Sequence, residues 1–275
     1  MPQPISTRIF TVANQKGGVG KTTSAVNIAA ALAMGGLRTL ILDLDPQGNA
    51  STAFGIARDE VMGMYEVIIK EEAIKNVALK IPGYPSLEVV PATQSLANAE
   101  VELVPMVARE TRLKKALTNY LLEAAGRGER FDYVIIDCPP SLGLLTINAL
   151  VAADELLIPI QCEYYSLEGL SLLLHTVTLI QEHLNPNLKL STIILTMYDG
   201  RTRLANDVAD EIRRHYPKEL IDVPIPRAVR VSEAPSYGQT VMTYDPGSNG
   251  ADAYARIARE IARRGAPPIN NAEVI

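Results

Sequence analysis

The chain has 275 residues, 47% of them hydrophobic, and its formal net charge is −5. This composition supplies enough apolar side chains for a sizeable core, and α/β folds of this length often form a single unit. The acidic balance excludes a generally basic, nucleic-acid-coating chain, so any surface for nucleic acid must be local. The chain has two cysteines and no apolar run long enough to cross a bilayer, which indicates a cytoplasmic protein with reduced thiols.

Apolar and amphipathic segments alternate along the chain and predict a mostly parallel, twisted sheet with helices on both faces. Near-continuous apolar runs suit strands that are buried on both sides. The expected strands are Ile9–Ala13, Thr39–Leu42, Leu87–Val90, Tyr133–Ile136, Glu155–Ile160, Leu190–Leu195, Ile221–Val223 and Val241–Tyr244. Helical spacing of apolar residues predicts helices at Ser24–Met34, Arg109–Ala125, Ser166–Glu182, Thr202–Tyr216 and Asn249–Arg264.

The sequence gives no reason to divide the chain into several domains. It has no internal repeat and no long linker, although Ala57–Tyr84 is irregular, with short helical pieces and no clear strand. We therefore expect one α/β domain over residues 1–268. Residues 269–275 are expected to form a flexible tail.

Residues 12–23 form a glycine-rich loop between the first strand and the first helix. Glycines adopt positive φ readily, so the backbone can turn several N–H groups toward phosphate oxygens. In this context Lys21 is expected to reach the β- and γ-phosphates, and the Thr22 hydroxyl to bind Mg²⁺. Gln15 replaces the first glycine of the general pattern, and a second lysine, Lys16, begins the loop. The expected nucleotide-binding residues are Gly17, Gly18, Val19, Gly20, Lys21, Thr22 and Thr23.

Carboxylates follow two further strands. Asp43 and Asp45 come at the end of the second strand, where α/β sheets bind ligands, although Asp, Pro, Gly and Asn also favour a simple turn. Asp45 could orient an attacking water, while Asp43 could contact Mg²⁺ waters or the loop itself. Asp137 ends the apolar strand Tyr133–Ile136, the Walker B arrangement that binds Mg²⁺ directly or through water. The expected metal-binding residues are thus Thr22, Asp43 and Asp137.

These motifs together resemble the ParA/Soj group of partitioning ATPases, within the deviant Walker A class of P-loop NTPases that also contains MinD. The matching segments are Lys16–Thr23, Asp43–Asn49, Asp137–Ser141, Ile225–Arg227 and Glu233–Ser236. The resemblance covers about residues 8–264. It implies a single-domain P-loop NTPase fold and an ATPase that uses ATP and Mg²⁺ to partition DNA.

The resemblance also implies roles for single residues. Lys16 would reach across a homodimer interface to the partner's nucleotide, so that two subunits enclose two ATP molecules. Asp45 would position the attacking water, which makes Lys16, Lys21 and Asp45 the expected catalytic residues. The base would lie near Met197 and Pro226. ATP is favoured over GTP because Thr196–Asp199 lacks the lysine of a guanine-binding motif.

Basic residues slightly outnumber acidic ones between Gly200 and Val231. Arg203 is expected to pair with Asp207 along a helix. Arg201 and Arg230 lack partners at helical spacing, lie in expected loops, and match positions of a non-specific DNA surface in Soj-like proteins. The expected DNA-binding residues are Arg201, Arg230, Arg227 and Arg203.

The resemblance implies a homodimer with ATP, non-specific double-stranded DNA and a ParB-like centromere-binding protein as partners, at a cytoplasmic, nucleoid-associated location. A MinD-like membrane-cycling ATPase is an alternative, but it requires a basic amphipathic terminal helix. Gly265–Ile275 contains two prolines and no lysine or arginine, which favours no membrane partner. An ATPase that positions a protein cargo remains open.

Overall fold

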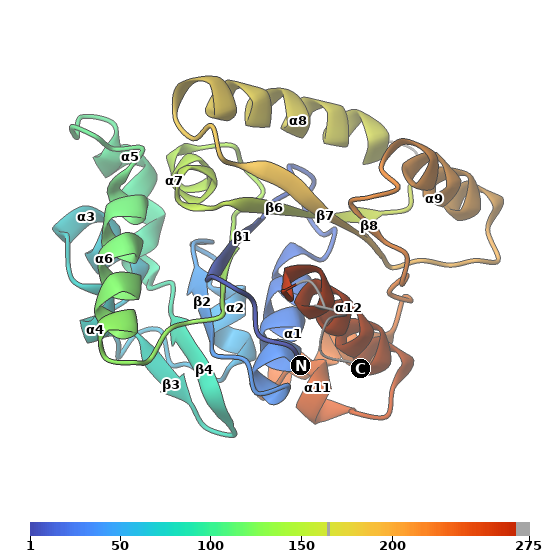
Figure 1. Ribbon diagram of the computed structural model, residues 1–275, viewed down its shortest axis with the longest axis horizontal. Helices are drawn as coiled ribbons and strands as arrows, with labels where there is room; N and C mark the ends of the chain where they lie inside the picture. The colour runs from blue at the N-terminus through green and yellow to red at the C-terminus, as the bar shows by residue number, and fades with distance from the viewer. Residues whose placement is uncertain (164–165, 268–275) are drawn as a thin grey trace, which may run out of the picture.

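The computed structural model of the protein describes residues 1–163 and 166–267 (Figure 1). These residues form one eight-stranded sheet with the order β3-β4-β2-β5-β1-β6-β7-β8. Strand β3 pairs antiparallel with β4, and the other neighbouring strands are parallel. The strands are β1 (Arg8–Val12), β2 (Thr39–Asp43), β3 (Leu79–Ile81), β4 (Tyr84–Val90), β5 (Tyr133–Asp137), β6 (Glu155–Gln161), β7 (Lys189–Thr196) and β8 (Leu220–Ile221).

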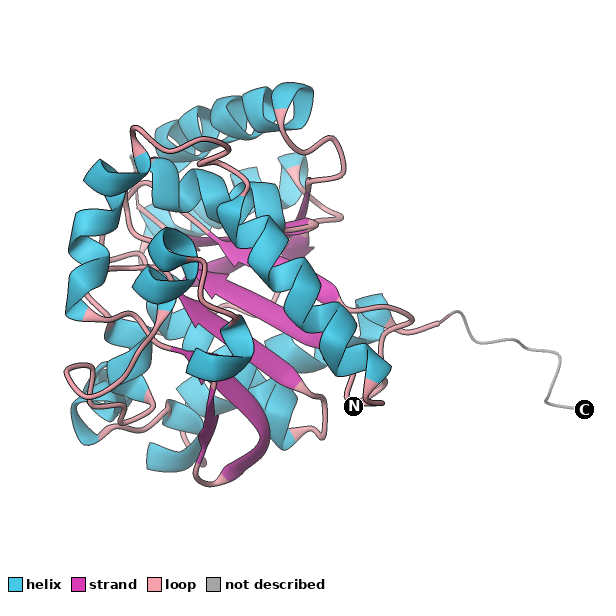
Figure 2. Cartoon of the chain, turned by 90° about the vertical axis from the view of Figure 1, so that its left-hand side faces the viewer, coloured by secondary structure: helices cyan, strands magenta, loops and turns pink. Residues whose placement is uncertain are grey.

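Helices cover both faces of this sheet, as Figures 1 and 2 show, and confirm the predicted α/β fold. One face packs against α1, α2, α11 and α12, and the other against α3 to α9. The helices are α1 (Lys21–Met34), α2 (Asn49–Ala53), α3 (Met64–Lys70), α4 (Ile74–Val77), α5 (Ala99–Leu103), α6 (Arg112–Gly126), α7 (Leu144–Ala152), α8 (Ser166–His183), α9 (Arg203–His215), α10 (Val229–Glu233), α11 (Val241–Tyr244) and α12 (Asn249–Gly265). Two 3₁₀ turns, η1 (Gln94–Asn98) and η2 (Ala234–Tyr237), join them.

The sheet brings the predicted carboxylates together at one edge. Strand β1 lies between β5 and β6, and Val12 at its end is opposite Asp137 of β5. On the other side of β5, Asp137 is opposite Asp43 of β2. Because the carboxyl ends of parallel strands form the ligand-binding edge of such sheets, the fold positions these groups beside the glycine-rich loop.

Two sequence-based expectations about strands were wrong. Val241–Tyr244 is the helix α11, not a strand, because its first N–H is bound 2.8 Å from the Asn27 side-chain oxygen of α1 and not by a neighbouring strand. Ala57–Tyr84 does contain a strand, since Leu79–Ile81 forms an edge hairpin with β4 through a turn at Gly83, whose φ is +82°. The short apolar run of β3 gave little periodic signal.

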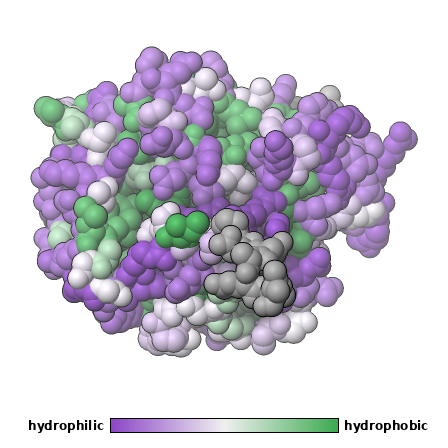
Figure 3. Space-filling view, in the orientation of Figure 1, coloured by the Kyte–Doolittle hydropathy of each residue, from purple (hydrophilic) through white to green (hydrophobic). Residues whose placement is uncertain are grey.

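Helix α7 was not predicted, because most of its side chains are buried and its sequence therefore shows no amphipathic period. On the face shown in Figure 3, the surface is mostly hydrophilic with smaller apolar areas. The predicted tail at 269–275 lies outside the described residues.

Candidate nucleotide site

The glycine-rich loop connects the central strand β1 directly to α1, which begins at Lys21 itself and not at Ser24. Gly18 and Gly20 have φ values of +73° and +85°, a region that favours glycine. Asn14 fixes the start of the loop, because its amide donates to the Pro159 carbonyl at 2.8 Å and its oxygen accepts the Lys16 N–H at 3.0 Å. The loop is thus shaped by its glycines and fastened to β6.

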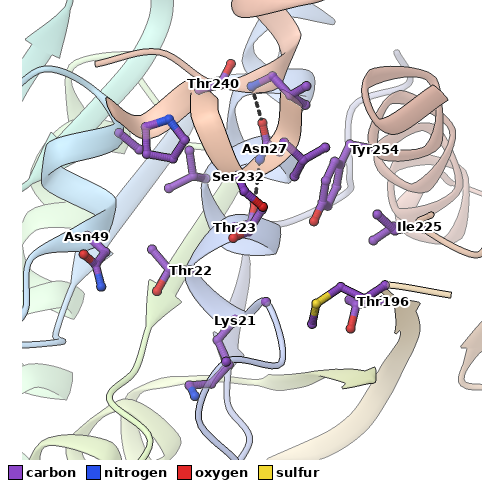
Figure 4. A pocket seen from close by; sticks show the side chains of 18 of the residues that line it. Lys21, Thr22, Thr23, Asn27, Asn49, Thr196, Ile225, Ser232, Thr240 and Tyr254 are labelled. Carbon is purple, nitrogen blue, oxygen red and sulfur yellow. Dashed lines mark hydrogen bonds between the residues drawn. The ribbon is translucent and has the colours of Figure 1, made fainter. Parts of the chain in front are cut away.

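A cavity of about 540 Å³ opens beside this loop (Figure 4). Of the predicted nucleotide-binding residues, all but Val19 line it. The predicted lining residues are Gly17, Gly18, Gly20, Lys21, Thr22, Thr23, Met197 and Pro226. Val19 is buried instead, and its carbonyl accepts a hydrogen bond of 2.8 Å from the Thr196 hydroxyl. A cavity of this size, with a loop of backbone N–H groups at one end, suits a nucleotide.

Lys21 is a largely buried cation, with 7% of its surface exposed. Its Nζ donates to the Lys16 carbonyl at 3.2 Å. Burial lowers the pKa of Lys21, while the nearby negative charge of Asp137 opposes that shift. A buried ammonium at the base of a phosphate-sized loop is suited to bind phosphate oxygens.

Asp137 is fully buried, and neither of its carboxylate oxygens has a hydrogen-bond partner among the described residues. Burial raises the pKa of Asp137 well above its usual range, and the charge of Asp43 adds to this rise. Thr22 lies close enough for its hydroxyl to oppose the shift. Hydroxyl and carboxylate oxygens are ligands that Mg²⁺ prefers, so Thr22 and Asp137 fit a Mg²⁺ ion beside the loop.

Asp43 is also fully buried, but its carboxylate is already used within the protein. Its Oδ2 accepts hydrogen bonds from the Ser51 N–H at 2.8 Å and the Ser51 hydroxyl at 2.6 Å. Burial raises the pKa of Asp43 to about 6, whereas these two hydrogen bonds lower it. Asp43 does not line the cavity. Asp43 thus fastens α2 to the end of β2, next to the residues that do line the cavity, and its contact with Mg²⁺ stays a prediction.

Asp45 and Lys16 have different surroundings. Asp45 lines the cavity and is 7% exposed, with its Oδ1 accepting the Gln47 N–H at 2.9 Å. Lys16 does not line the cavity. Its half-buried Nζ lies 2.5 Å from Glu163 Oε2, on the exposed side of the loop. The carboxylate thus faces the cavity, whereas the first lysine of the loop is not among the residues that line it.

The opposite end of the cavity is formed by the ends of late strands and by the C-terminal segments. Met197, directly after β7, has a positive φ of 48°, which is uncommon outside glycine. Figure 4 shows Asn27 between Thr23 and the segment that carries Thr240, and Ser232 and Tyr254 also line the cavity. The Asn27 amide donates to the Thr23 carbonyl at 2.7 Å. Motif reasoning missed these side chains, because they come from helices without a recognisable signature.

Known proteins resemble this chain over nearly its whole length. A family profile described as an AAA domain matches residues 7–190. The chromosome partitioning protein ParA of Myxococcus xanthus is 49% identical over 94% of this chain and 89% of its own length. The sporulation initiation inhibitor protein Soj of Bacillus subtilis is 49% identical over 94% of this chain and 99% of its own.

Among solved structures, the cobyrinic acid a,c-diamide synthase of Mycobacterium smegmatis, with a bound ATP analogue and magnesium, is 36% identical to this chain. It superimposes with a TM-score of 0.79 over 94% of this chain and 95% of that one. The chain belongs to the ParA/Soj family of partitioning ATPases.

The arginines that the ParA/Soj resemblance suggested for DNA binding lie in two places. Arg201 follows β7 and is bound to Asp199 by two hydrogen bonds of 2.7 and 2.8 Å. Arg227 is exposed and lines the nucleotide cavity, near enough to Asp199 to help lower the pKa of that carboxyl. Arg203 begins α9, with its side chain 94% exposed and 3.7 Å from Asp207, as expected. Of these three arginines, Arg227 lines the cavity, whereas Arg201 and Arg203 do not.

Arg230 does not line the cavity, although its neighbours Val231 and Ser232 do. It was expected in a loop without a partner at helical spacing, but it lies in α10 and its Nη1 is 3.2 Å from Glu233, three residues later. The Tyr244 hydroxyl lies 3.5 Å from the same nitrogen. A helix places residues three apart on one face, which is why Glu233 becomes a partner. The Arg230 side chain is still 59% exposed.

Proposed function

We propose that this ParA/Soj-family chain is a DNA-partitioning ATPase in which Mg²⁺-ATP drives formation of a sandwich homodimer. ATP and Mg²⁺ are its cofactors. The dimer binds double-stranded DNA without sequence preference, and a ParB-like centromere-binding protein accelerates the hydrolysis that releases it. Such a protein would be cytoplasmic and associated with the nucleoid. The relative named for chromosome partitioning, at 49% identity, is more similar to this chain than the synthase at 36%.

The observation that carries this proposal is the different placement of the two lysines of one loop. Lys21 is buried at the cavity, whereas Lys16 lies outside it and is paired only with the half-exposed Glu163 among the described residues. An exposed lysine gains little from such a surface pair. It gains far more where it meets phosphate charge in an interface that excludes water.

The side chains of this chain suit in-line attack of water on the γ-phosphate. Lys21 would bind phosphate oxygens, and Lys16 from the partner would approach the same group, so that the negative charge of the transition state is spread over cations. Asp45 would orient the attacking water by accepting one of its protons in a hydrogen bond. Thr22 and Asp137 would hold the Mg²⁺ ion, which supplies further charge neutralisation when bound.

The first experiment measures DNA binding, ATP binding and oligomeric state of the wild type with ATP, with ADP and without nucleotide. We expect the wild type to bind DNA and to dimerise only in the presence of ATP. If no nucleotide state binds DNA, the partitioning proposal is wrong, and recovery of a protein cargo in place of a centromere-binding protein would favour the cargo-positioning alternative. ATP-dependent sedimentation with liposomes would favour the MinD-like alternative.

Among the described residues, no helix combines the length and apolar character needed to cross a membrane.

The variant Lys16→Ala tests the sandwich directly. It should bind ATP with an affinity within a few-fold of the wild type, because Lys16 does not line the cavity, but it should not dimerise with ATP. Size-exclusion chromatography with ATP measures this, with Lys80→Ala, an exposed lysine on β3, as the matched control. A normal ATP-dependent dimer of Lys16→Ala would contradict the proposed interface.

A further inference from the structure

The carboxylate of Glu100, on α5, caps the start of a different helix. Its Oε2 accepts the Leu144 N–H at 2.8 Å, and its Oε1 accepts the Leu145 N–H at 3.2 Å. These are the first two residues of α7, whose own N-cap residue, Gly143, provides no side-chain cap. The first N–H groups of a helix have no partner within it, and they favour a negative charge. Glu100 therefore supplies the N-terminal side-chain cap that the sequence of α7 itself lacks.

The contact depends on a missing side chain at Gly143. The φ of Gly143 is −78°, which any residue can adopt, so its backbone conformation does not require glycine. A Cβ atom at this position would instead overlap the carboxylate of Glu100. The absence of a side chain at Gly143 thus leaves the space in which the Glu100 carboxylate approaches the helix.

Helix α7 fixes the position of one end of the loop that follows Asp137. Pro140 of this loop lines the nucleotide cavity. The Thr146 hydroxyl, in the first turns of α7, donates to the Ser141 carbonyl at 2.7 Å. The other end of the loop is fixed where Asp137 ends β5 between its two parallel neighbours. The position of the loop beside the phosphate site therefore depends on the first turn of α7.

Residues 91–100, the connector that leads from β4 to Glu100 of α5, also contact the loop on the other side of the site. The Ala92 carbonyl accepts a 2.8 Å hydrogen bond from Arg58 Nε, and Arg58 Nη2 donates to the Pro46 carbonyl at 2.6 Å. The Ala92 N–H donates to Ser51 at 3.0 Å, the residue that binds Asp43. The connector is therefore anchored near Asp45 at one end and at α7 at the other.

We propose that Glu100 is a positioning residue for ATP hydrolysis, which fixes the Asp137–Gly143 loop by capping α7. This inference rests on the proposed ATPase function. The body of α7 has an independent anchor, because Asn148 accepts the Leu113 N–H at 3.2 Å and donates to the Arg109 carbonyl at 2.7 Å. Loss of Glu100 should thus loosen only the first turn of α7 and the loop before it, and the fold should remain.

The test compares Glu100→Ala, Glu100→Gln and Gly143→Ala with the control Val101→Ala. Val101 is the next residue of α5 and is 75% exposed. We expect kcat for phosphate release to fall about tenfold in Glu100→Ala and by less in Glu100→Gln, whose amide oxygen can still accept one N–H. KM for ATP, the affinity for a fluorescent ATP analogue and the melting temperature should stay near wild-type values. The control should match the wild type.

Gly143→Ala should reduce kcat in the same way, because its new methyl group displaces the carboxylate. Combining it with Glu100→Ala should then add little further loss, since both changes remove one interaction. Unchanged kcat in Glu100→Ala, a fully additive double variant, or a parallel fall of kcat, ATP affinity and melting temperature would each overturn the positioning role. These outcomes differ from failure of the proposed function, in which the wild type itself releases no phosphate or binds no DNA.

Discussion

At the scale of single residues, burial of Lys21 and Asp137 has an electrostatic cost. Both are buried, and the Asp137 oxygens have no hydrogen-bond partner in the described part of the chain. Burial lowers the pKa of Lys21 and raises the pKa of Asp137, because each group loses hydration of its charged form. Buried groups with shifted pKa values in a cavity are characteristic of functional sites. The cost is offset when a phosphate and a cation are bound.

Asp45 is expected to be required for ATP hydrolysis but not for the binding of ATP or DNA. Its side chain lines the cavity, and the hydrogen bond that it accepts from the Gln47 N–H is local, so Asp45→Ala should leave the fold and ATP binding intact. We expect the variant to lose phosphate release, by about 10²-fold or more, and to keep ATP-dependent DNA binding. A phosphate-release assay alongside a gel shift measures both, with Asp252→Ala on the exposed side of α12 as control. Normal turnover would assign the water-positioning role to another residue.

At the scale of elements, α1 connects the phosphate loop to the far end of the cavity. Asn27, two turns after the loop, accepts the Val241 N–H at 2.8 Å and donates to the Thr23 carbonyl at 2.7 Å. The same residue lines the cavity. This contact starts α11 and joins it to α1, so it fixes the segments that enclose the nucleotide away from its phosphates.

Removing the Asn27 side chain should lower both the stability of the fold and the affinity for ATP. Asn27→Ala leaves the buried Val241 N–H without its acceptor, so the free energy of unfolding should fall by about 1–3 kcal/mol. The affinity for ATP should fall as well, because the cavity wall is less well fixed. Urea unfolding and a fluorescent ATP analogue measure the two effects, with the exposed Asn76→Ala of α4 as control. An unfolding curve equal to the wild type would show that Asn27 is not a structural link.

At the scale of the whole molecule, the net charge of −5 opposes general attraction to DNA. The proposed DNA binding must therefore come from the local arginines. In one subunit they are few and partly engaged, with Arg201 held by Asp199 and Arg230 close to Glu233. A dimer doubles the number of phosphate contacts on one surface, which explains why ATP-dependent dimerisation would control DNA binding.

Arg230→Ala tests this surface. It should weaken DNA binding about equally for all sequences and reduce the slope of log K against log salt by about 1 for each phosphate that Arg230 no longer neutralises. ATP-dependent dimerisation should not change, because in the proposed sandwich Lys16, and not Arg230, reaches the nucleotide of the partner subunit. Gel shifts over a salt series measure the slope, with Arg256→Ala of α12 as control. An unchanged slope would remove Arg230 from the DNA surface.

The local features of the fold and site could be predicted because they depend on short-range rules. A glycine loop between an apolar strand and a helix requires only neighbouring residues, and Lys21, Thr22 and Asp45 do line the cavity. Glu100 and Asn27 could not be found in this way. Each acts on a segment distant in sequence, Glu100 on Leu144 and Asn27 on Val241, and neither belongs to a pattern with a fixed spacing.

The sequence by itself determined the order of most strands and helices, the phosphate loop, and the carboxylates at the ends of β2 and β5. Backbone conformation and apolar periodicity are sufficient for these, since both are encoded in adjacent residues. Only the tertiary structure decided that Asp43 binds Ser51 and stays out of the cavity, that Arg230 lies in a helix beside Glu233, and that Glu100 caps α7. Packing between segments that are distant in sequence determines most of these contacts, so a local sequence pattern does not predict them.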